Sequence, residues 1–496
     1  MFPKAFAFIF LTVAAIHGAE APSRGRVLDL TLGKAIQMAL GKNFSIAVEK
    51  FEPQVARERE RVAEGRFDPA FSLSYRRGED VMSDRFIRGT TGGTHFGVKA
   101  IDQTATWSTG VTGVTIWGLG YDVGLSTTSR GGTANSFEQD FSSEVSFSLR
   151  QPLLRGAGTA ANLASVRVAR NNVAISEWGV KQQVMTVITQ VIEVYNELQF
   201  AHENLEVARR SRGLAKQLLR DNIKRVEIGV KTPLDVTTAQ AEVAAREEAV
   251  ITAGRAVKDQ ENFLKQLVTA DLIPLLGTSV QIAPPPSPVF ESNVVAGLTD
   301  ALELRPDYRQ AKLDIQNRHI NVAYTKNDRL PRLDLVASLN LLGFDDDFGS
   351  SAQRTLARDQ SAWSAGATFS IPIGNREGSG RYNAAKIESA QTLVKLQQLE
   401  QEIIVRVDNA NGAVVTSRER VDATMEARRL AKESLAAGEA RLIAGTGTTF
   451  EVLELQKKLT EAETSELRAH ADYNKAVARY RLQTGTTLRV HGVKVE

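Results

Sequence analysis

The chain of 496 residues contains no cysteine, which excludes a disulfide framework, thiol chemistry and a lipid-modified N-terminal cysteine. The six histidines are scattered, and none pairs with another at the spacing of metal ligands. No Ser–His–Asp set and no paired carboxylates suggest a catalytic centre. The 61 basic and 58 acidic side chains nearly cancel, to a formal charge of +3. We therefore expect no enzyme, no metal, no cofactor and no nucleic-acid partner.

Long apolar runs are also scarce. The first extends from Ala5 to Ile16, after Lys4, and small residues follow it through Ala19 and Ala21. This pattern predicts a secretory signal peptide over residues 1–21. The run is shorter than the ~20 residues of a membrane-spanning helix, which disfavours an anchor. The mature protein is expected to be exported, and any membrane crossing is expected to use strands.

What the chain does contain is an internal duplication. Residues 225–236 match residues 441–452 at an offset of 216, and Ala39-Leu40 matches Ala301-Leu302 at an offset of 262. Each copy is predicted to contain a half-length helix, strands and a long helical hairpin. Repeat 1 covers 22–271 (strands 67–155, hairpin 158–268), a linker covers 272–290, repeat 2 covers 291–486 (strands 331–374, hairpin 380–483), and a C-terminal tail covers 487–496.

The strand regions show a period of two with one apolar face. Phe71, Leu73 and Tyr75 alternate with polar residues, and the second copy repeats this alternation over 333–341 and 363–371. Such strands fit either a soluble sandwich or a membrane barrel. The first copy has 83 residues between Phe71 and Leu153, where the second has 41 between Leu333 and Ile373. The excess predicts either an additional hairpin or a long external loop.

The helical regions that follow are unusually long. No proline occurs from Ala161 to Val226, a run of ~66 residues that would extend about 100 Å as a helix. The second copy is similar from Tyr382 to Leu442. Apolar residues recur at steps of three and four, which is typical of a coiled-coil seam.

Each hairpin is predicted to turn at a glycine, Gly229 in the first copy and Gly445 in the second, because a left-handed residue commonly ends a helix. The next helices begin with the capping pairs Thr232/Asp235 and Thr448/Glu451. Asp235 and Glu451 can be capping acids alone. Glu454 lies one turn further on the face of Glu451, where capping does not need it, and the first copy has Thr238 at that position.

The chain resembles the TolC-type outer-membrane efflux proteins. The resemblance rests on the duplicated element order, on the segment 151–156 (Gln-Pro-Leu-Leu-Arg-Gly), and on a tip glycine followed six residues later by an acid and valine. It implies an α+β membrane protein. The resemblance further implies that three copies form one β-barrel in the outer membrane of a Gram-negative envelope, continued into the periplasm by a long α-helical coiled-coil barrel. The implied function is an exit duct for small molecules or proteins.

The resemblance also implies site residues and partners. The tips dock a periplasmic adaptor (membrane fusion) protein, coupled to an inner-membrane pump of the RND, ABC or MFS type, while the barrel contacts outer-membrane lipid. The implied docking residues are Gly229, Lys231, Thr232, Gly445, Gly447 and Thr448. The implied entrance and selectivity residues are Glu451, Glu454 and Asp235.

Two positions depart from the family pattern. Gly447 stands where the family example has a basic residue, and Leu442 stands where it has an aromatic residue. The contacts that close the channel are therefore predicted to be rewired. The alternative function is a periplasmic adaptor or coiled-coil scaffold without channel activity. Such a protein would carry one hairpin between compact β modules, so two hairpins favour the channel.

Overall fold

The computed structural model describes residues 27–85, 98–135, 138–229, 232–285, 288, 290–358 and 360–495. The predicted signal peptide and Lys231 lie outside these described residues. The chain divides into two compact units. The hairpin unit comprises Met1–Lys50, Gly179–Pro306 and Glu400–Glu496, and the sheet unit comprises Phe51–Trp178 and Asp307–Leu399. Among the described residues, no helix is both long enough and apolar enough to cross a membrane.

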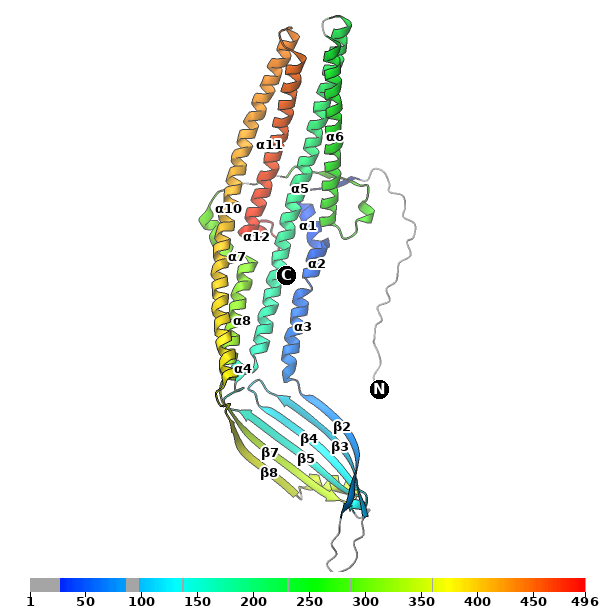
Figure 1. Ribbon diagram of the computed structural model, residues 1–496, viewed down its shortest axis with the longest axis vertical. Helices are drawn as coiled ribbons and strands as arrows, with labels where there is room; N and C mark the ends of the chain where they lie inside the picture. Colours follow the sequence, from blue (N-terminus) through cyan, green and yellow to red (C-terminus); the bar gives the residue numbers. More distant parts are fainter. Residues whose placement is uncertain are drawn as a thin grey trace, which may run out of the picture. The chain divides into compact units, whose positions relative to one another are not determined.

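Two helical hairpins dominate the hairpin unit (Figure 1). The first is α5 (Ala164–Glu227) with α6 (Pro233–Val268), and the second is α10 (Arg376–Ile443) with α11 (Thr449–Gln483). The two outgoing helices have 64 and 68 residues, which confirms the prediction of very long helices. The shorter elements of this unit are α1 (Leu32–Lys42), α2 (Phe44–Glu49), α7 (Val294–Leu304) and α12 (Thr487–Val490).

A small parallel sheet closes the core of the hairpin unit. Strand β1 (Val27–Leu30) pairs with β6 (Ser279–Ile282), so part of the segment interpreted as an extended linker is a strand. Four residues are too few to show a period, which is why the sequence did not reveal it. The hydroxyl of Tyr195, a fully buried residue, donates to the carbonyl oxygens of Leu30 (3.1 Å) and Ala283 (2.5 Å). Burial raises the pKa of this hydroxyl, against the opposing effect of the bond to Ala283.

The predicted half-length helix of the first copy is divided near Pro53. Helix α2 ends at Glu49, and α3 (Glu52–Glu64) begins with Pro53 in its first turn, where a missing N–H costs no hydrogen bond. A second break lies at Asn43, whose side chain caps α2 by accepting from the N–H groups of Ser45 and Ile46.

The sheet unit is built on one antiparallel sheet of six strands in the order β2-β3-β4-β5-β7-β8. The first copy supplies β2 (Ala70–Arg85), β3 (Val98–Val114), β4 (Gly120–Gly131) and β5 (Asp140–Pro152). The second supplies β7 (Arg332–Asp345) and β8 (Gln360–Ser370). The excess residues of the first copy therefore form an additional hairpin, β3–β4, inside the sheet. Helices α3, α4 (Thr159–Asn162) and α8 (Pro306–Asp328) adjoin one end of these strands.

The two faces of this sheet differ, as the alternation predicted. One row across all six strands is apolar: Phe71, Val111, Val123, Phe147, Leu339 and Trp363. The adjacent row on the opposite face is small or polar: Ser72, Gly110, Gly124, Ser146, Asn340 and Ala362. The apolar row is exposed, with Phe71 at 72% and Trp363 at 76%. A soluble sandwich would bury such a face against a second sheet.

Candidate functional site at the hairpin tips

The first hairpin turns at Gly229, which has a φ of +75° and donates its N–H to the carbonyl of Val226. Thr232 then caps α6. The carboxylate of Asp235 accepts from the backbone N–H (3.1 Å) and the hydroxyl (2.8 Å) of Thr232. The predicted capping box is confirmed.

The second hairpin turns in the same way at Gly445, with a φ of +79°. The N–H groups of Thr446 and Gly447 both donate to the carbonyl of Arg441 at 3.1 Å. Thr448 caps α11 by accepting from the N–H of Glu451 at 3.2 Å. A Cβ at Gly447 would lie 3.0 Å from the backbone nitrogen of Leu442, so a side chain at this position would crowd the end of α10.

Arg441 is a tip residue to which the sequence analysis assigned no role. Its guanidinium lies 2.5 Å from the carboxylate of Glu451, across the turn of its own hairpin. A signal was present, since Arg441 and Arg225 occupy matching positions four residues before the two tip glycines. Gly447 has no side chain, so it is Arg441, near the end of α10, that supplies a positive charge at this turn.

The three predicted acids therefore have different environments. Asp235 caps a helix and Glu451 forms an ion pair with Arg441. Glu454 is half-buried, and within the described part of the chain no Lys or Arg forms an ion pair with it. Of the three carboxylates, Glu454 is the one for which the described residues show neither a capping hydrogen bond nor an ion pair.

The two hairpins contact each other just below their turns. Leu218 of α5 packs with Leu435, Leu442, Val452 and Leu453 of the second hairpin. Asn222, which is fully buried, donates to the carbonyl of Asp235 (3.4 Å) and accepts from the hydroxyl of Thr449 (3.5 Å). Leu442, where the family example has an aromatic residue, is thus part of an apolar contact between hairpins.

Both turns also expose large apolar side chains. Leu234 is 73% exposed, and its counterpart Phe450, 216 residues later, is 67% exposed. Ile228 and Ile443, at the ends of α5 and α10, are exposed to 73% and 79%. These four side chains form an apolar surface at each tip, together with the glycines and threonines predicted there.

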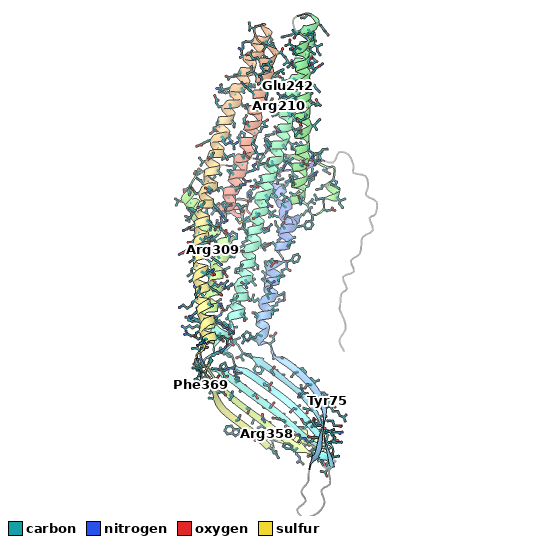
Figure 2. The ribbon with its side chains drawn as sticks, viewed as in Figure 1. Tyr75, Arg210, Glu242, Arg309, Arg358 and Phe369 are labelled. Carbon is teal, nitrogen blue, oxygen red and sulfur yellow. The ribbon has the colours of Figure 1, made fainter. Side chains whose placement is uncertain are left out.

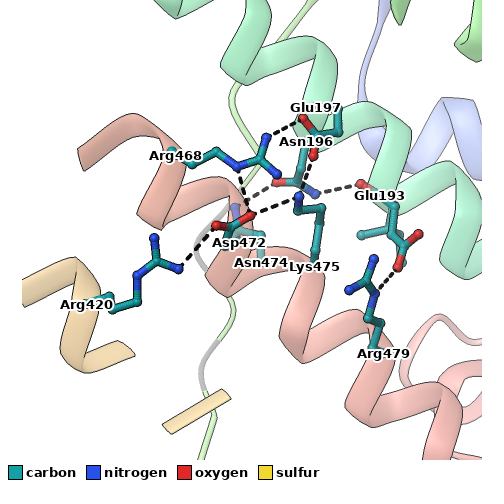
Figure 3. A network of polar contacts seen from close by, with 10 residues as sticks. Glu193, Asn196, Glu197, Arg420, Arg468, Asp472, Asn474, Lys475 and Arg479 are labelled. Atoms are coloured by element: carbon teal, nitrogen blue, oxygen red, sulfur yellow. Dashed lines mark hydrogen bonds and ion pairs between the residues drawn. The ribbon is translucent and has the colours of Figure 1, made fainter. Parts of the chain in front are cut away.

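Further along the hairpins, a polar network joins α5, α10 and α11 (Figure 3). Glu197 of α5 lies 2.9 Å from Arg468 and also pairs with Lys475, both on α11. Asp472 lies 3.0 Å from Lys475, 3.1 Å from Arg468 and 3.4 Å from Arg420 of α10. Burial alone would raise the pKa of Asp472, but these three cations together hold it below its ordinary value of 3.8.

This network predicts a loss of stability in acid. The folded state keeps Asp472 charged at a pH where the unfolded chain already takes up a proton. The contribution of this carboxylate to the free energy of unfolding is therefore present above pH 3.8, and it is lost as the pH falls through the lower pKa of the folded state. The unfolding temperature should therefore drop less between about pH 6 and about pH 3 in Asp472→Asn than in the unmodified protein. The matched control is Asp422→Asn on α10, whose side chain is 68% exposed. Equal pH dependence in all three proteins would contradict the assignment.

Among the described residues, no cluster of three His, Asp or Glu side chains could hold a metal ion.

Comparison with known proteins points to one family. The family model for outer membrane efflux proteins matches residues 118–270 and 297–486. The chain is 22% identical to outer membrane protein TolC of Vibrio cholerae serotype O1, over 63% of this chain and 70% of that protein. It is 24% identical to the alkaline protease secretion protein AprF of Pseudomonas aeruginosa, over 70% and 71%. The structure is similar to the Campylobacter jejuni CmeC outer membrane channel, with a TM-score of 0.67, 16% identity and coverage of 92% and 85%.

Proposed function

The chain belongs to the outer membrane efflux protein family, which makes it an outer-membrane channel of the tripartite efflux and type I secretion systems, and we propose that three copies of it build the exit duct. The alternative of an adaptor or scaffold required one hairpin between compact β modules. The chain instead has two hairpins and a six-stranded sheet with an exposed apolar face.

The edges of the sheet support the trimer. Among the described strands, β2 and β8 each pair on one side only, and lipid offers no hydrogen bonds to an open edge. All neighbouring strands are antiparallel, so β8 runs opposite to β2. The β8 edge of one copy can therefore pair with the β2 edge of the next and continue the pattern. Three copies of six strands would make a ring of eighteen, a size that leaves an aqueous channel.

The trimer gives a direct prediction. Light scattering of the detergent-extracted protein should report three copies per particle, because only closure satisfies both sheet edges. Phe450→Ala, a change at an exposed tip residue, should leave this number unchanged and serves as the control. A particle of one copy that remains soluble without detergent would overturn the proposal.

The hairpin tips are proposed as the docking surface for a periplasmic adaptor, which couples the duct to an inner-membrane pump. The argument rests on the two matching turns, each with a positive-φ glycine, a threonine cap and exposed apolar side chains. Aromatic side chains that fill a pocket of the partner commonly carry much of the binding energy of an interface, and the exposed ring of Phe450 could act in this way.

The entrance charge is proposed to come mainly from Glu454. In a trimer the three Glu454 carboxylates would form a ring, and rings of acids favour cations in a pore. Glu451 contributes less because Arg441 lies beside it.

A further inference from the structure

A ten-residue helix, α9 (Phe348–Ala357), lies in the connection between β7 and β8. This connection is at the end of the sheet opposite to α3, α4 and α8, since β2 and β7 start beside those helices and run away from them. In Figure 2, Arg358, the residue after α9, lies toward the end of the sheet away from Phe369. The function of the tips does not involve this helix.

Helix α9 packs closely against Ser143 and Gly343 of the sheet, a site that we call the seat. The hydroxyl of Ser351 donates to the hydroxyl of Ser143 and to the carbonyl of Gly343, both at 2.9 Å. The hydroxyl of Thr355 donates to the carbonyl of Ser143 at 3.2 Å. Ser351 and Thr355 are buried, and a Cβ at Gly343 would lie 2.2 Å from the carbonyl oxygen of Ser351. The helix can approach this closely only because residue 343 has no side chain.

The seat lies on the apolar face of the sheet, at its outer margin. The rows of this face continue from Leu73 and Leu341 toward the end of the sheet where α9 lies. The next row contains Tyr75, Trp107, Thr127, Ser143 and Gly343, one residue from each strand from β2 to β7. On β2 and β3 this row holds an aromatic pair with ring centroids 4.4 Å apart. On β4, β5 and β7 it holds small residues, and α9 packs against β5 and β7. Membrane strands carry aromatic girdles at the edge of their apolar band, and here α9 replaces part of one.

The two flanks of α9 differ in polarity. Arg354 lies 2.8 Å from the carboxylate of Asp345 and donates to the carbonyl of Phe344, so its flank faces the outer end of β7. At 100° per residue, Leu356 is on the other flank of the helix from Arg354, and it is 75% exposed. Ala352 and Phe348, one and two turns earlier, follow the same flank.

We propose that α9 is an interfacial helix that inserts Leu356 and Phe348 among the lipids of the outer leaflet, with the Arg354 flank in the headgroup layer. The proposal rests on the outer-membrane placement of the sheet, because the apolar face must contact lipid. It follows from the continuity of α9 with that face and from the amphipathic flanks, a pattern typical of helices that lie in the membrane plane.

The absence of cysteine makes a direct test possible, since any introduced cysteine is the single thiol of the chain. The variants are Leu356→Cys on the apolar flank, Gln353→Cys on the polar side of the same helix, and Leu125→Cys within the apolar face. Each is reconstituted as a trimer in vesicles of phosphatidylethanolamine, phosphatidylglycerol and lipopolysaccharide. A charged, membrane-impermeant thiol reagent should modify Leu356→Cys about tenfold more slowly than Gln353→Cys, and lipids brominated near the headgroup should quench a fluorophore at 356.

The Leu125→Cys variant distinguishes a failure of the inference about α9 from a failure of the proposed membrane placement of the sheet. If Leu125→Cys is protected and Leu356→Cys reacts as fast as Gln353→Cys, α9 is an aqueous loop and the inference is wrong. If Leu125→Cys also reacts fast, the membrane placement of the sheet is wrong. Protection of Leu356→Cys that persists in detergent without quenching by brominated lipid would assign the surface to another protein and also overturn the inference.

A second variant tests the seat. Gly343→Val places a side chain against the backbone of α9, so it should expose Leu356→Cys to the reagent and abolish its quenching by lipid. The matched control is Gly366→Val on β8, where a Cβ meets only a methyl group of Val336 at 3.9 Å. If Gly343→Val leaves both readouts unchanged in a trimer, the helix does not depend on this seat.

Discussion

Replacing Glu454 with glutamine is expected to lower the preference of the channel for cations, while Arg441→Gln is expected to raise it. The first change removes an acid with no described ion-pair partner, and the second frees Glu451 from the guanidinium 2.5 Å away. At about 6 Å in water a carboxylate attracts a univalent cation by about 0.7 kcal/mol. Three of them, partly screened by salt, amount to about 1 kcal/mol, or a roughly fivefold change in the occupancy of the entrance by cations, and anions are repelled by a similar amount.

Reversal potentials in planar bilayers under a salt gradient measure this preference, and block by divalent cations should change in the same direction. The control is the double variant Arg441→Gln/Glu451→Gln, which removes a cation and an anion from one ion pair and should shift selectivity little. If Glu454→Gln leaves the selectivity of a folded trimer unchanged, Glu454 is a surface residue and the constriction lies elsewhere.

Replacing Gly445 with valine is expected to abolish docking of the periplasmic adaptor while the trimer stays intact. Gly445 has a φ of +79°, and a left-handed conformation costs an L-residue about 1–2 kcal/mol, more for a β-branched one. The turn would rearrange, and with it the threonine cap of α11 and the presentation of Phe450. Because a few anchors carry most of the energy of an interface, we expect at least about a tenfold loss of docking.

A photoreactive residue at position 234, in the other turn, measures docking in cells, with the crosslinked partner identified by mass spectrometry. The matched control is Gly412→Val on α10. That glycine also has open space around a Cβ but lies within a helix and has no positive φ. Loss of crosslinking in both variants would point to general damage of the hairpin. Undiminished crosslinking in Gly445→Val would mean that the adaptor binds away from this turn.

The features that the sequence predicted are those encoded by nearby residues. Helix length follows from the absence of proline between residues 161 and 226, and the cap at Thr232 follows from an acid three residues later. Strand faces follow from the alternation around Phe71 and Leu339. The roles of the acids were less predictable, because capping and ion pairing use the same side chains.

By itself, the sequence determined the duplication, the two long hairpins, the conformation of their turns and the apolar face of the strands. Each of these depends on contacts within one or two turns of helix or along one strand. Only the tertiary structure decided that β6 pairs with β1, that β3 and β4 join the sheet, and that Arg441 faces Glu451. It also placed α9 on a seat whose hydroxyls, Ser143 and Ser351, are 208 residues apart. Small residues allow α9 to approach the sheet closely, but they do not specify which strands it packs against. The packing partner is therefore determined only when the strands assemble.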